Sequence, residues 1–183
     1  MLQILIILVI LIASVLIYAA TKPNKFHIER STTIKAPPEK IFPLINDFGA
    51  WDAWTPYNKD PAMKKNLSEN HVGKGSVLAW EGNTEVGKGE IAITESLAPK
   101  RVALDLHMIK PFEVHNHVVL ALNAAAGSTT VTWIMDGTQA YFVKLMGLFF
   151  NMDRVVGKDF EVGLARLKRI AEKKGVGSLT TGT

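Results

Sequence analysis

Histidines and carboxylates are the side chains whose spacing comes nearest to a chemical site in this sequence. Glu113, His115 and His117 alternate along one segment, so in a strand they share a face, and His107 shares a face with Asp105 in the preceding segment. The opposite faces of both segments are apolar, which predicts that the histidines face solvent. A zinc site needs at least a third protein ligand beside two histidines. The sequence therefore predicts no metal site.

The sequence contains no recognised catalytic motif. It has no H-E-x-x-H, G-x-S-x-G, Walker loop or dinucleotide-binding fingerprint. Gly87-Lys88-Gly89 lies in a predicted strand, where glycine relieves backbone crowding in a curved sheet. Glu95 and Asp153 are expected at solvated positions. Acid–base catalysis needs groups within hydrogen-bond reach of one another, and no such set converges. We predict neither a catalytic residue nor a cofactor.

Asn116 is a polar residue that alternation places on an apolar, inward face. Burying an amide without a partner costs about 1–3 kcal/mol, so its side chain must be bonded to protein, water or ligand. Trp80 and Trp133 also fall on inward faces, where they pack in the core or line a cavity. Trp54 is expected at the entrance of such a cavity or as a lid on the sheet.

The elements that position these residues follow from hydrophobic periodicity. Period-two alternation predicts strands over residues 28–34, 62–68, 76–81, 87–96, 101–109, 113–124 and 128–137. Two short helices follow the first strand, one opened by Ala36-Pro37-Pro38-Glu39 and one over 50–54. An apolar stripe at spacings of three and four predicts one long helix from Tyr141 to Lys173. This order predicts an α+β helix-grip fold, in which a curved antiparallel sheet of about seven strands wraps on the C-terminal helix.

Four segments carry a resemblance to a known family. They are ERSTTIKAPPEKIFPLINDFGAWDAWTPY, GKGSVLAWEGN with VGKGEIAITES, TTVTWIMDG and KLMGLFFNMDRVVGKDFEVGLARLK. With them the chain resembles the polyketide cyclase/dehydrase-like group of the START/Bet v1 (SRPBCC) superfamily over nearly all of residues 26–173. The resemblance implies an apolar cavity between the sheet and the C-terminal helix. It does not fix an activity, since one scaffold of this kind hosts several functions.

The first 20 residues carry no charge and are almost entirely aliphatic. A helix of about 20 such residues spans a bilayer core, so residues 1–21 are predicted to be a transmembrane helix. The alternative is a cleaved signal peptide, but no basic residue precedes the run and Tyr18 is bulky where a small residue is wanted. Lys22, Lys25 and Arg30 follow the span, which favours a single-pass membrane protein with its soluble domain in the cytoplasm.

Composition supports one folded domain after the anchor. We expect a linker over 22–25, the helix-grip domain over 26–174 and a disordered tail over 175–183. The net charge is +4, and no aromatic-basic pattern of a nucleic-acid site is present, so nucleic acid is not an expected partner. Cysteine is absent, which excludes disulfides and thiol chemistry.

The predicted function is binding of an apolar or amphipathic small molecule, such as a lipid, between the sheet and the C-terminal helix. Such pockets have apolar walls and few orienting polar groups. The expected lining residues are Trp54, Leu78, Trp80, Ile91, Leu104, Leu106, Asn116, Val118, Trp133, Met135, Met146, Phe149 and Phe150. Two alternatives stay open: an enzyme of the cyclase/dehydrase or hydrolase type that uses the same cavity, and a tethered interaction module with a filled core.

Overall fold

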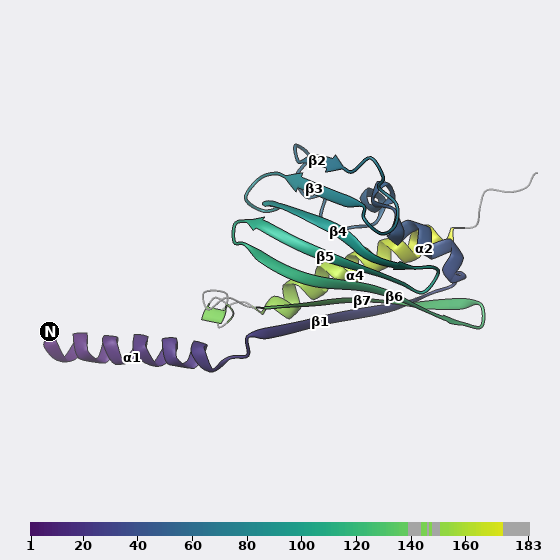
Figure 1. Ribbon diagram of the computed structural model, residues 1–183. Coiled ribbons are helices and arrows are strands. Elements are labelled where there is room, and N and C mark those ends of the chain that lie inside the picture. Colours follow the sequence, from purple (N-terminus) through teal and green to yellow (C-terminus); the bar gives the residue numbers. More distant parts are fainter. Residues whose placement is uncertain (139–143, 146, 148–150, 174–183) are drawn as a thin grey trace, which may run out of the picture.

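A computed structural model describes residues 1–138, 144, 145, 147 and 151–173 of the chain (Figure 1). Its elements, in chain order, are α1 (Leu2–Thr21), β1 (Lys25–Ile34), α2 (Pro38–Asn46), the 3-10 helix η1 (Phe48–Ala53), β2 (Lys64–Leu67), β3 (Val77–Glu81), β4 (Lys88–Leu97), β5 (Arg101–Lys110), β6 (Val114–Ala125), β7 (Ser128–Thr138) and α4 (Met152–Glu172).

The strands form one seven-stranded antiparallel sheet in the order β1-β7-β6-β5-β4-β3-β2. From β2 to β7 each strand pairs with its neighbour in sequence, and β7 then pairs with β1. Short connections of this kind are typical of an antiparallel meander. Because β1 and β7 pair, the start of the domain at Lys25 lies beside the end of β7 at Thr138.

Helix α4 packs across one face of the sheet, which we call the inner face; the opposite face is the outer face (Figure 1). Its residues Phe160, Leu164, Leu167 and Ala171 are buried at the spacing of a helical stripe. They meet the inward residues of β1, β6 and β7 in one apolar core, which α2 and η1 extend. Together with the sheet order, this packing confirms the predicted helix-grip fold.

The two ends of the sheet differ. The register places Phe26 of β1 beside Gly137 of β7 and Gly137 beside Asn116 of β6, so the start of β1, the end of β7 and the turn between β5 and β6 lie at one end. We call this the anchor end, because α1 leaves the domain there (Figure 1). Helix α2 and η1 lie toward the other end.

The C-terminal helix is shorter than the sequence predicts. The described helix begins at Met152, and Asn151 has extended backbone angles (φ −82°, ψ 101°). The Asn151 side chain accepts a hydrogen bond from the backbone N–H of Arg154, at 3.0 Å, as an N-cap residue does. A continuous helix from Tyr141 to Lys173 is therefore wrong, although the apolar stripe beyond Met152 is confirmed.

Helix α1 projects away from the sheet (Figure 1). It is the one helix in the described part of the chain that is long and apolar enough to cross a membrane. Among its residues only Ala19 is buried. Nearly all of its other aliphatic side chains are exposed.

Candidate functional site

The inner face is built from rows of side chains that the strand register aligns. One row, across four strands, consists of Ile28, Met135, Val118 and Leu104, all of which are buried. The next row toward the anchor end consists of Asn116, Leu106, Ile91 and Leu78. The predicted lining residues of the strands therefore do share one face.

Side chains fill the space between α4 and the half of the inner face that β1 and β7 form. Phe160 of α4 lies parallel to Trp133, with ring centroids 4.2 Å apart and an interplanar angle of 5°. Trp54 meets the same ring edge-on at 5.4 Å. The closest part of α4 is Gly163, where a Cβ would come within 2.8 Å of the Trp133 ring. Trp133 is thus a core residue in this conformation.

Trp54 does not lie at an entrance. It is fully buried, and its indole N–H donates a hydrogen bond of 2.9 Å to the carbonyl oxygen of Leu44. The indole N–H of Trp51 is held in the same way, at 3.0 Å from the Ile45 carbonyl. Both rings fasten η1 to α2, so the expectation of an entrance residue is wrong and the packed alternative holds.

The other half of the inner face, formed by β3 to β5, is only partly covered. Leu78, Trp80, Leu106 and Met108 are half-buried there. The indole N–H of Trp80 donates to the carbonyl of Val86 at 3.0 Å, which fixes the ring over the sheet. These apolar side chains form a strip that we call the open strip.

Gly89 explains how the Trp80 ring lies flat on the sheet. A Cβ at this position would stand 2.7 Å from the ring, and the pairing of β4 with β5 shifts register between Lys88 and Gly89. A glycine in a strand often marks such a close approach or bulge. The Gly87-Lys88-Gly89 segment therefore serves sheet geometry, as predicted.

Asn116 faces inward next to the open strip, as alternation predicts. It is 8% exposed, and within the described residues its Oδ1 has no hydrogen-bond partner. The side chain lies over Gly137, whose missing Cβ leaves the space that the amide occupies. A buried acceptor without a partner costs about 1–3 kcal/mol. A bound molecule that donates a hydrogen bond to this oxygen would recover that free energy.

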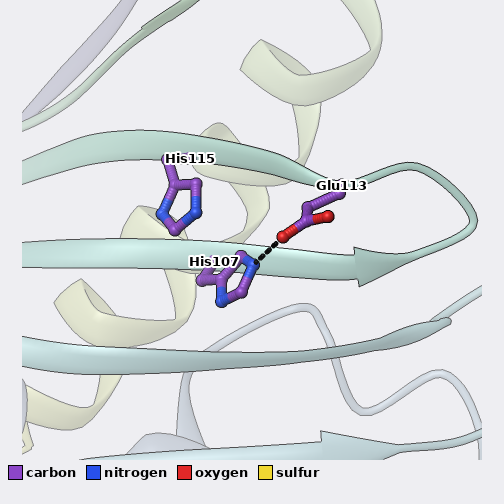
Figure 2. A group of neighbouring side chains, drawn as sticks. All are labelled: His107, Glu113 and His115. Carbon is purple, nitrogen blue, oxygen red and sulfur yellow. Dashed lines mark hydrogen bonds and ion pairs between the residues drawn. The ribbon is translucent and has the colours of Figure 1, made fainter.

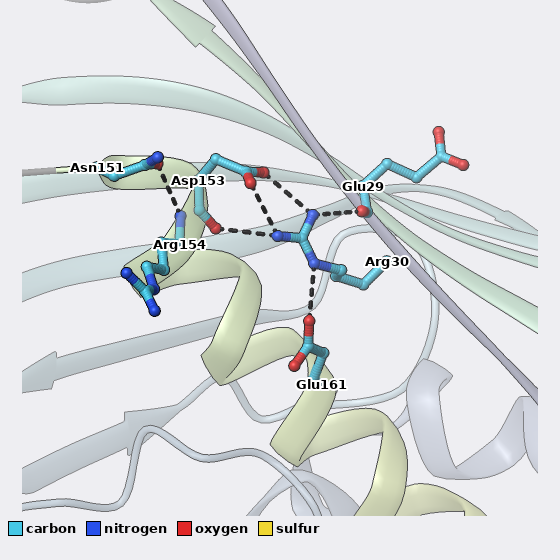
Figure 3. A network of polar contacts seen from close by, with 6 residues as sticks. All are labelled: Glu29, Arg30, Asn151, Asp153, Arg154 and Glu161. Carbon is cyan, nitrogen blue, oxygen red and sulfur yellow. Dashed lines mark hydrogen bonds and ion pairs between the residues drawn. The ribbon is translucent and has the colours of Figure 1, made fainter.

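A charged network ties the start of α4 to β1 (Figure 3). The guanidinium of Arg30 donates to both carboxylate oxygens of Asp153, at 3.0 and 2.9 Å, and to Glu161 at 3.0 Å. This pairing lowers the pKa of Asp153, chiefly through the hydrogen bonds from Arg30. Gly157 gives the guanidinium room beside the helix. Because Arg30 on β1 pairs with two carboxylates of α4, the network positions the start of the helix.

An open hollow of about 350 Å³ lies at the anchor end between β1 and the start of α4. Its apolar lining includes Phe26 and Met152. Lys22, Lys25 and Lys144 line it as well, and the Lys144 ammonium hydrogen-bonds to the side chain of Asn24. Asp153, which is paired with Arg30, and His27 also line it. The hollow therefore combines an apolar wall with three lysines, directly beside the C-terminal end of α1.

Some predicted lining residues are not described by the structure, and some residues of the inner face were not predicted to line the cavity. Met146, Phe149 and Phe150 lie outside the described residues. Phe26 and Met108 belong to the inner face but are not among the predicted lining residues, although alternation places Met108 on the same face as Leu104 and Leu106. The first falls before the predicted start of its strand, and the second is an inward residue whose half-exposure follows from where α4 crosses.

Comparison with known proteins agrees with this architecture. A family model described as "Polyketide cyclase / dehydrase and lipid transport" matches residues 25–172. None of the curated proteins matches the chain.

Solved structures with the same fold include a crystal structure of the di-domain ARO/CYC BexL from the BE-7585A biosynthetic pathway. The TM-score is 0.63 at 13% identity, over 87% of this chain and 54% of that one. Protein CV1439 from Chromobacterium violaceum gives a TM-score of 0.58 at 14% identity, over 84% of this chain and 100% of that one. Ara h 8.0201 gives 0.55 at 14% identity, over 80% and 97%. At these identities the likeness shows the fold alone.

Proposed function

Because the chain belongs to the family described as polyketide cyclase / dehydrase and lipid transport, we propose that it is a membrane-anchored protein that binds an amphipathic small molecule on the inner face of its sheet. The observation that carries the proposal is the open strip. It consists of half-buried apolar side chains beside one buried amide acceptor without a partner. Ligand pockets are built in this way, from apolar walls and few polar groups that fix orientation.

The size of the hydrophobic term is sufficient for useful affinity. A ligand chain that buries about 500 Å² of apolar surface gains about 12 kcal/mol at 25 cal/mol/Å². Loss of translational and rotational freedom costs about 4 kcal/mol or more. About 8 kcal/mol then remains, which corresponds to a Kd of about 1 μM.

The hollow at the anchor end supports an amphipathic ligand in particular. Its apolar wall continues the inner face through Phe26 and Ile28, and Lys22 and Lys25 line it at the end of α1. An aliphatic chain that runs from the open strip across the anchor end, over Asn116 and Gly137 to Phe26, would place an anionic head group near Lys22 and Lys25. The same rim adjoins α1, so a molecule could pass between the bilayer and the domain without crossing water.

Membrane anchoring by α1 is part of the proposal. The helix has 20 residues, none of them charged and most of them aliphatic, and Lys22 and Lys25 follow it. We expect the chain to stay in the membrane fraction after alkaline washing, with uncleaved Met1–Thr21. A reporter fused after Thr183 should be active only in its cytoplasmic form. A mature chain that starts near Thr21, or an active exported reporter, would contradict the anchor or its sidedness respectively.

The ligand proposal is tested by the fluorescence of Trp80. The other three tryptophans are at most 6% exposed, whereas Trp80 is half-buried on the open strip. Titration of the domain from Lys22 onward with a long-chain fatty acid should change the emission saturably, and Trp80→Phe should remove most of the change.

Two neighbouring residues offer a matched pair of variants. Leu78 and Ala79 are both half-buried on β3 but point to opposite faces. Leu78→Arg should abolish the response, whereas Ala79→Arg should leave it intact. Equal effects of the two variants, or no saturable response in the wild type, would contradict binding on the inner face. Turnover of the ligand would instead assign the site to an enzyme of the cyclase/dehydrase type.

A further inference from the structure

The outer face carries a second group of chemically capable side chains, at the anchor end of the hairpin formed by β5 and β6. His107 and His115 stand directly opposite each other in the register. Their rings are stacked, with centroids 4.0 Å apart and an interplanar angle of 12°. Glu113, directly before β6, places Oε1 3.2 Å from His107 Nε2 (Figure 2).

The pairing of β5 with β6 brings His107 beside Glu113 and His115, so three possible ligands meet that sequence spacing alone does not bring together. One ligand atom from each of His107, Glu113 and His115 lies within 4.8 Å of the others. In a tetrahedral zinc site with bonds of about 2.0–2.1 Å, ligand atoms are about 3.4 Å apart. The 3.2 Å between His107 Nε2 and Glu113 Oε1 already matches that edge. Parallel stacked rings do not point their lone pairs at one ion, so the His115 ring must tilt out of the stack to bind it. His115 and Glu113 are exposed, which leaves their side chains room to turn.

A further carboxylate can orient the central imidazole. Glu90 of β4 places Oε1 3.8 Å from His107 Nδ1, on the side of the ring away from Glu113. With an ion bound at Nε2 in place of the proton that Glu113 accepts, the proton of His107 would lie on Nδ1, on the side of Glu90. The separation of 3.8 Å is longer than a hydrogen bond, and a shift of about 1 Å would bring Glu90 within reach of Nδ1. In that position Glu90 would hold the second ring nitrogen, as carboxylates outside the ligand set do for metal-bound histidines.

We propose that His107, His115 and Glu113 form a binding site for one Zn²⁺ ion on the outer face, with Glu90 as the residue that orients His107. Two imidazoles and one carboxylate are ligands that Zn²⁺ accepts, and they leave a fourth position for water. The site stands apart from the open strip, since it lies on the opposite face of the sheet. The ion would join β5, β6 and the turn between them.

The test is a zinc titration of the full-length chain in phosphatidylcholine nanodiscs, prepared without a polyhistidine tag. Competition with a chromophoric chelator should give one tight site per chain. Co²⁺ in place of Zn²⁺ should give the visible absorption of a tetrahedral ion. Glu113→Gln changes an exposed turn residue, so it should weaken binding without affecting folding, which circular dichroism checks.

The other variants separate ligands from neighbours. His107→Ala and His115→Ala should abolish the tight site. Glu90→Gln should weaken it by about 10–100-fold, the usual effect of losing such an orienting partner. His117→Ala is the matched control, because His117 is exposed on the same face two residues beyond His115. A wild type without a saturable site, or equal losses in His115→Ala and His117→Ala, would overturn the proposal.

Discussion

Replacing Phe160 with alanine tests how α4 is fastened to the sheet. The Phe160 side chain is fully buried, and its ring covers the face of Trp133 in a parallel stack at 4.2 Å. The substitution removes the ring and leaves Trp133 facing a cavity, because the neighbouring Gly163 has no side chain to fill the space.

The expected loss follows from the burial. Truncation of a buried phenylalanine to alanine costs about 3–5 kcal/mol, from lost transfer free energy and the cavity left behind. The stacked pair accounts for about 0.5–1.5 kcal/mol of this loss. Val155 on the same helix is 58% exposed, so Val155→Ala should change the stability by less than about 0.5 kcal/mol.

The assay is urea denaturation of the domain from Lys22 onward, followed by tryptophan fluorescence and circular dichroism. Phe160→Ala should lower the midpoint with an unchanged slope, as a two-state domain with lost packing does. A loss below about 1 kcal/mol would refute the reasoning, since Phe160 could then not be the residue that seals the core against Trp133.

Three further predictions concern other parts of the chain. Removal of residues 1–21 should leave a domain that unfolds cooperatively, because only Ala19 of α1 is buried; a chain without cooperative unfolding would contradict this. Gly163→Ala should destabilise the domain by about 1–2 kcal/mol in the same urea assay, since its Cβ would press on Trp133, although helix propensity alone predicts a gain of about 1 kcal/mol. The hydrogen bond from His27 to Asp136 raises the pKa of His27; this pairing stabilises the folded state fully below about pH 6.5 and is lost as the pH rises through the raised pKa. Titration of His27 by NMR should show a lower pKa in Asp136→Asn, and an unchanged pKa would contradict the pairing.

The sheet could be predicted from sequence because a strand has a strict period of two. Leu104 and Leu106 were assigned to the inner face by alternation, and the structure confirms both. Asn116 was assigned in the same way, against its polarity, and it does face inward. Such assignments need only local information, since a side chain's face depends on its parity within one strand.

The start of α4 could not be found from the apolar stripe. Leu145 and Phe149 continue the spacing of Phe160 backward along the chain, so periodicity alone extended the helix to Tyr141. In the structure the described helix begins at Met152, and the side chain of Asn151 caps it by accepting from the backbone N–H of Arg154. Asparagine is a favoured N-cap residue, so its identity was the available signal.

The environment of each inward residue depends on where α4 crosses the sheet, which no local pattern contains. Trp133 and Trp80 are both inward tryptophans, yet the first lies under Phe160 and the second lies half-buried on the open strip. The contact between His107 and Glu113 likewise needs the register of the β5–β6 hairpin. The first feature depends on the long-range packing of α4, and the second on the register of one hairpin.

The most direct test of the proposed function is the position of a bound chain on the sheet. NMR of the domain from Lys22 onward, with labelled methyl groups and a ¹³C-labelled fatty acid, measures contacts between ligand and protein protons. We predict contacts from the acyl chain to Leu78, Leu106 and Met108, and none to Ala79 on the outer face. Contacts confined to the outer face, or none at a saturating concentration, would contradict the proposal that the inner face holds the ligand.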